Sequence, residues 1–165
     1  MKATGSDKNL IRASERPQEV TFSHPLNPRS EMRGFSLSDA VGLHRVGFHL
    51  VCIPPGKEAN MYHAHTAEEE FYFVLSGRGV AEVDGVEHEI GPGDFLGFPA
   101  PSVPHQLRNP FGEDLVYLVG GERREMELGS FPRLGKRVLR VGREAWLIQD
   151  RELRPFWKAD GGKEE

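Results

Sequence analysis

The chain has 165 residues, a net charge of −4 and a pI near 6.0, so its overall charge favours neither nucleic acid nor an anionic membrane as a partner. Cys52 is the single cysteine, which excludes an internal disulfide and a zinc finger. No apolar run approaches the roughly 20 residues that a membrane span requires, and the N-terminus has no apolar signal core, so we expect a cytoplasmic protein.

Residues 1–32 are polar and contain three prolines, and we expect a flexible N-terminal arm in which Val20–Phe22 can form a short edge strand. Beyond this arm, short runs rich in β-branched and aromatic residues alternate with turns about every ten residues, which is typical of a sandwich or barrel. The runs are VGFHLVCI, EFYFVL, VAEV, VEHEI, FLGFPA, SVPHQLRN and LVYLVGG. This pattern predicts an all-β domain over residues 33–122. Residues 123–165 are then a C-terminal extension with one or two strands and a frayed tail.

Four side chains in this domain form a candidate metal site. His63 and His65 lie two residues apart in a segment that we expect to be a strand, so both side chains point to one face. Glu70 begins the next apolar run, and His105 lies 35 residues further on. Three imidazoles and one carboxylate suit one divalent transition metal ion, such as Fe, Mn, Ni, Zn, Co or Cu.

Alternation along the strand that begins at Glu70 indicates which side chains share its face. Tyr72 lies on the face of Glu70, toward the barrel interior, while Phe71, Phe73 and Leu75 lie on the other, which we expect to pack beneath a second layer. Tyr72 is therefore our candidate for an acid–base role beside the metal. An aromatic lining residue without chemistry is an equal interpretation of Tyr72.

Two ordered motifs in this region resemble those of the cupin superfamily. The first runs Gly56, six residues, His63-x-His65, four residues, Glu70, six residues and Gly77, where the family has five residues after the first glycine. The second runs Gly93, five residues, Pro99 and then His105-x3-Asn109. Pro101 stands where the family has glycine, and one extra residue precedes His105, so we expect a reshaped loop there.

The resemblance covers roughly residues 43–121 and implies a double-stranded β-helix, or jelly-roll barrel, with a metal inside. By this resemblance the ligands are His63, His65, Glu70 and His105. The family includes dioxygenases, isomerases, epimerases, decarboxylases and binding proteins. The resemblance therefore implies the fold and a bound metal for this chain, but it does not imply a particular reaction.

Three classes of function remain open. The first is a metal-dependent enzyme acting on a small organic substrate, with a dioxygenase-type oxidoreductase favoured over a sugar isomerase or epimerase. The second is a non-enzymatic binder of a sugar or phenolic acid, and the third is a barrel with a structural ion. Four protein ligands leave coordination positions free, which favours the enzyme. We also expect a homodimer, because outer strands have unpaired edges that Val20–Phe22 or a strand near Trp146 can cover.

Overall fold

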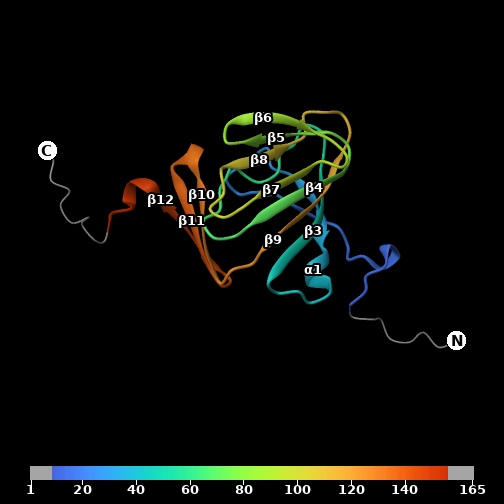
Figure 1. The fold of residues 1–165 in the computed structure, drawn as a ribbon, viewed down its shortest axis with the longest axis horizontal. Coiled ribbons are helices and arrows are strands. Elements are labelled where there is room, and N and C mark those ends of the chain that lie inside the picture. Colours follow the sequence, from blue (N-terminus) through green and yellow to red (C-terminus); the bar gives the residue numbers. More distant parts are fainter. Residues whose placement is uncertain (1–8, 156–165) are drawn as a thin grey trace.

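Antiparallel strands make up most of the regular structure in residues 9–155, the part of the chain that the computed structural model describes (Figure 1). From one edge to the other, the larger sheet consists of β1 (Val20–Phe22), β2 (Met32–Ser36), β3 (Val46–Ile53), β9 (Leu115–Glu122), β4 (Glu70–Ser76) and β7 (Phe95–Phe98). A second sheet consists of β6 (Val86–Ile90), β5 (Gly79–Val83) and β8 (His105–Arg108). These two sheets form the barrel, so the all-β jelly-roll prediction is confirmed.

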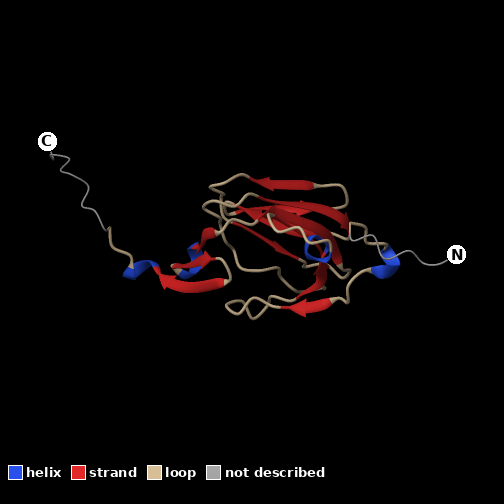
Figure 2. Cartoon of the chain, turned by 90° about the horizontal axis from the view of Figure 1, so that it is seen from below, coloured by secondary structure: helices blue, strands red, loops and turns tan. Residues whose placement is uncertain are grey.

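A third sheet lies beside the barrel and extends away from it (Figure 2). Its strands are β10 (Met126–Phe131), β11 (Lys136–Val141) and β12 (Glu144–Gln149), paired in that order. Helical turns occur at η1 (Ala13–Glu15), α1 (Leu37–Ala40), η2 (Pro132–Leu134) and η3 (Asp150–Glu152). Within residues 9–155, no helix is long and apolar enough to cross a membrane.

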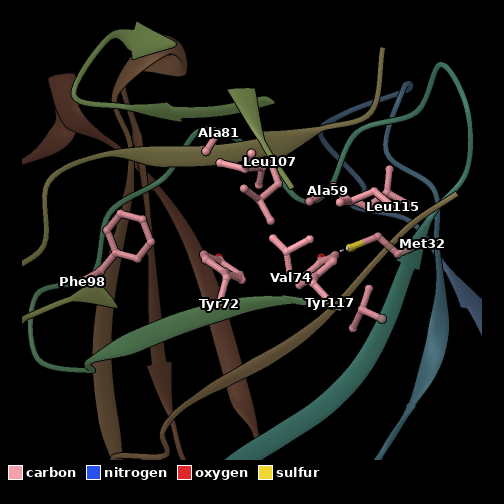
Figure 3. Packing of buried hydrophobic residues seen from close by; sticks show 12 residues of the cluster. Met32, Ala59, Tyr72, Val74, Ala81, Phe98, Leu107, Leu115 and Tyr117 are labelled. Carbon is pink, nitrogen blue, oxygen red and sulfur yellow. Dashed lines mark hydrogen bonds between the residues drawn. The ribbon is translucent and has the colours of Figure 1, made fainter. Parts of the chain in front are cut away.

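The hydrophobic core lies between the two barrel sheets (Figure 3). Val74 of β4 and Tyr117 of β9 come from the larger sheet, and Ala81 of β5 and Leu107 of β8 come from the smaller one. All four are at most 2% exposed. Burying a side chain of the size of Val74 or Leu107 contributes roughly 1.5–3 kcal/mol, so these inward positions fix the register of the strands.

The turn between β5 and β6 follows directly from its sequence. Asp84 and Gly85 have φ angles of 49° and 78°, the left-handed values that a two-residue hairpin of this type requires. The flanking residues Val83 and Val86 pair across it. The Asp-Gly signal therefore predicts this hairpin correctly.

Two local predictions need correction. His63 and Ala64 form only isolated bridges, to His105 and Ser130, so the His-x-His segment is not a regular strand. The outer face of β4 also lacks the expected second layer in the part of the chain that the structure describes, since Phe73 and Leu75 are 38% and 41% exposed. The inward face agrees with the predicted alternation.

The two ends of the chain differ in part from expectation. β1 is an edge strand, as predicted, and it pairs with β2 of its own chain. The extension has three strands where the sequence indicated one or two, because the charged residues before β10 and the glycine within it weaken the strand signal. Residues 1–8 of the predicted arm and 156–165 of the predicted tail lie outside the described residues. The boundaries of the barrel domain, between residues 32 and 33 and between residues 122 and 123, stay predictions.

Candidate metal centre

The structure brings the four predicted donors together. His63 and His65 lie between β3 and β4, Glu70 begins β4, and His105 begins β8. One donor atom from each of the four residues lies within 4.8 Å of the others. The Nε2 atoms of His63, His65 and His105 lie 3.8, 3.7 and 2.9 Å from Oε2 of Glu70. The group suits a metal ion of the kind that nitrogen and oxygen donors bind.

Backbone pairing explains how residues far apart in sequence converge. The His63 N–H donates to the carbonyl of His105 at 3.1 Å, and the His105 N–H donates back at 2.8 Å. The two imidazole centroids consequently lie 4.6 Å apart. His65, two residues after His63, adds its ring at 5.0 Å from that of His63. The i, i+2 geometry thus delivers both rings to one site without a regular strand.

Hydrogen bonds to the far ring nitrogens orient two of the histidines. Nδ1 of His63 lies 2.7 Å from the carbonyl oxygen of Met61, and Nδ1 of His105 lies 3.0 Å from that of Val103. A carbonyl can only accept, so each Nδ1 carries the proton and each neutral ring presents an Nε2 lone pair to the centre.

These tautomers provide the test of whether a metal fits. In its neutral form, His105 directs a lone pair at the Glu70 carboxylate across 2.9 Å. Two acceptors at this distance attract each other only when a proton or a cation lies between them. Both ring nitrogens of His65 are also buried without a hydrogen-bond partner. A divalent cation would satisfy the Glu70 carboxylate and the Nε2 atoms of His105 and His65 together.

The charge states of His63 and Glu70 agree with metal binding. Burial lowers the pKa of His63 to about 4, so this ring is neutral at pH 7. Burial alone would raise the pKa of Glu70, but the neighbouring imidazoles of His105, His65 and His63 hold it well below its usual range. Neutral imidazole and ionised carboxylate are the forms that bind metals.

Tyr72 lies where the alternation of β4 predicts. Its hydroxyl donates to Oε2 of Glu70 at 2.6 Å, and the side chain is 5% exposed. Burial, together with the charge of Glu70, raises the pKa of Tyr72 well above its usual value. The hydroxyl therefore keeps its proton and can orient the carboxylate.

Two cavities meet beside the donor group, at His63 and Glu70. The inner cavity, about 260 Å³, lies within the barrel; the outer cavity, about 290 Å³, extends toward β10 and β11. Both are lined by Asn60, His63 and Glu70. The sequence motifs do not identify His49 in the inner wall or Arg140 in the outer wall. Only their place in the fold brings them to the site.

The loop before His105 carries Pro101 where the family motif has glycine, and one extra residue. The Ala100–Pro101 peptide bond in this loop is cis. His105 nevertheless lies against Glu70, and its ring stacks on Phe98 with centroids 3.7 Å apart. Asn109, the last residue of the second motif, is 1% exposed and donates to the carbonyls of Ile53 and Glu113. Asn109 therefore fixes the turn between β8 and β9.

Comparison with known proteins shows which fold family has this arrangement. Residues 49–126 match a family model described as a cupin domain. A crystal structure from Acidithiobacillus ferrooxidans, of a protein proposed to be a sugar phosphate isomerase, is 38% identical with a TM-score of 0.87, covering 92% of this chain and 98% of that one. A sugar phosphate isomerase of the cupin superfamily from Silicibacter pomeroyi is 29% identical with a TM-score of 0.70, covering 73% and 78%.

A curated relative matches a shorter stretch. An uncharacterized protein of Methanocaldococcus jannaschii is 35% identical over 57 residues, which are 34% of this chain and 44% of that protein. This chain thus spans less than half the length of that relative.

Proposed function

Since this chain belongs to the cupin superfamily, we propose that it is a metal-dependent enzyme acting on a small organic substrate. The observation that carries the proposal is the convergence of His63, His65, Glu70 and His105 beside two cavities: His63 and Glu70 line both, and His65 lines the outer one. A structural ion is usually enclosed by protein ligands, whereas His63, His65 and Glu70 border space that a substrate can enter.

The residues of the chain have distinct roles in this proposal. A bound divalent transition metal supplies Lewis acidity and, in the case of Fe, a redox centre for O2 chemistry. Glu70 provides the negative charge of the donor set, and Tyr72 holds that carboxylate in place through its hydroxyl. Tyr72 is also the nearest buried proton donor to Glu70, which makes it the candidate for proton transfer.

The lining of the inner cavity favours a dioxygenase-type oxidoreductase. Apolar walls come from Met32, Val51, Leu107 and Val119, and no Lys or Arg is among its described lining residues. No lysine or arginine among the described residues of this wall could pair with a phosphate group, whereas a small carbon skeleton can replace water along the apolar walls.

We expect Fe(II)-loaded protein to consume O2 with a member of a panel of small diketones, phenolic acids and thiols. Tyr72→Phe should lower the rate by about 10- to 100-fold if the hydroxyl holds Glu70, and by about 100-fold or more if it transfers a proton. Tyr62→Phe is the matched control, because this buried tyrosine packs against Arg133 and lines neither cavity. The measurement is initial rates in an oxygen electrode.

A sugar isomerase or epimerase is the second candidate. It is favoured by the assignments of the two relatives from A. ferrooxidans and S. pomeroyi, and by Arg140 in the wall of the outer cavity. No O2 uptake with any compound, together with turnover of a sugar or sugar phosphate under argon, would contradict the oxidoreductase and support this class. Tight binding without turnover in any metal form would leave a binding protein.

We also propose that the protein is cytoplasmic, because its single cysteine, Cys52, requires no oxidising compartment. We further propose that it forms a homodimer. Exposed apolar residues lie on edge strands of two sheets: Val20 and Phe22 on β1, and Trp146 and Leu147 on β12. Such edges need a cover. Light scattering at micromolar concentration should give about twice the chain mass of 18.5 kDa. A mass of one chain would contradict the dimer.

A further inference from the structure

Glu127 of β10 is a buried carboxylate that belongs to neither sequence motif. It is 4% exposed and lies one position beyond the segment that matches the family model. Its Oε1 accepts the N–H of Thr66 at 2.6 Å, and its Oε2 accepts those of Ala67 and Glu68 at 2.9 and 3.0 Å. One side chain of the third sheet therefore holds the loop that follows His65.

The same strand also holds the chain before His65. Ala64 and Ser130 exchange backbone hydrogen bonds of 3.0 and 2.9 Å. The hydroxyl of Thr66 donates to the carbonyl of Leu128 at 2.5 Å. His65 thus lies between two residues that are bound to β10, so the position of its ring depends on the third sheet.

The imidazole of His65 lies between two carboxylates. Its Nε2 is 3.7 Å from Glu70, and its Nδ1 is 3.6 Å from Oε1 of Glu127. Both nitrogens are buried and lack a hydrogen-bond partner, whereas the Nδ1 atoms of His63 and His105 each have a backbone carbonyl. Glu127 occupies, for His65, the place that a carbonyl occupies for the other two rings.

We propose that Glu127 is a positioning residue of the metal centre. It holds the 66–68 loop and lies 3.6 Å from Nδ1 of His65, so a proton on Nδ1 faces this carboxylate and the Nε2 lone pair is directed toward the other donors. A carboxylate behind a ligand histidine fixes its tautomer and raises its basicity, and its loss typically costs about 10- to 100-fold in metal affinity. This inference rests on the proposed function, because it concerns the same donors.

The test compares Co(II) binding to wild type, Glu127→Gln and Glu122→Gln. The Glu122 carboxylate accepts the N–H of Glu69 at 3.3 Å and pairs with Arg124 at 2.9 Å, so it holds the same loop from a place outside the donor group and is a matched control. Chelator competition should give a dissociation constant about 10- to 100-fold higher for Glu127→Gln and unchanged for Glu122→Gln. Proton NMR of the Co(II) forms should show three shifted, exchangeable imidazole N–H signals. In Glu127→Gln, one of the three should move and exchange faster with water.

The NMR signals show whether Glu127 positions His65 or only stabilises the fold. If Glu127 only stabilised the fold, all three N–H protons would stay protected from exchange in Glu127→Gln. If Glu127→Gln does not fold, Glu127→Asp keeps the charge but withdraws the carboxylate, and faster exchange of one signal is again expected. Wild-type affinity and three protected signals in the folded variant would overturn the inference while the metal site stands. Failure of the wild type to bind Co(II) would overturn both.

Discussion

Replacing His63 and His65 together with alanine is expected to abolish stoichiometric metal binding while the barrel stays folded. The double variant leaves Glu70 and His105 as the only donors of the group, too few for a stable site. The backbone bonds that join His63 to His105 do not involve the side chains and are retained. Metal analysis after dialysis, with circular dichroism for the fold, measures both parts of this prediction.

The matched control is the double variant His44→Ala/His88→Ala. Both histidines are exposed and lie outside the donor group, so this variant should bind metal like the wild type. Added metal should also raise the thermal midpoint of the wild type and the control, because a ligand of the native state stabilises it by about 2.7 kcal/mol at 100 times its Kd. Full metal retention by His63→Ala/His65→Ala would refute the donor assignment.

A second large effect is expected at Gly77, the last glycine of the first motif. Its φ angle is 75°, and an added Cβ would lie 2.1 Å from the carbonyl oxygen of Asp114. The backbone at Asp114 leads directly into Leu115, which is fully buried in the core. Neither segment can move without disturbing packing, so Gly77→Ala should lower the free energy of unfolding by about 3 kcal/mol or more.

Gly85→Ala separates the steric effect from the backbone effect. Gly85 has a φ angle of 78°, but nothing lies within 4 Å of its added Cβ. This variant should lose only about 1 kcal/mol, the cost of a left-handed conformation. Urea denaturation of the metal-free proteins gives both values. Equal losses in the two variants would show that the contact with Asp114 is unimportant.

The sequence was sufficient for the features that depend on local pattern. Alternation along β4 correctly separates the face of Tyr72 and Val74 from that of Phe73 and Leu75, because burial follows the period of a strand. The spacing of the two motifs also selects four residues whose donor atoms the fold brings together. Both signals are contained within short stretches of chain.

Features that depend on distant contacts could not be predicted. Glu127 and Thr66 are 61 residues apart, and a single glutamate in a charged segment has no motif of its own. The His-x-His segment resembles a strand in sequence, but its neighbours His105 and Ser130 pair with it at single residues only. Tertiary pairing therefore decided its structure, and local propensity did not.

Anomalous diffraction from crystals of metal-loaded protein tests the central claim most directly. The account predicts one anomalous peak per chain, about 2.0–2.2 Å from Nε2 of His63, His65 and His105 and from an oxygen of Glu70. A peak bound by other residues, or no peak among these four donors in protein that carries one equivalent of metal, would contradict it.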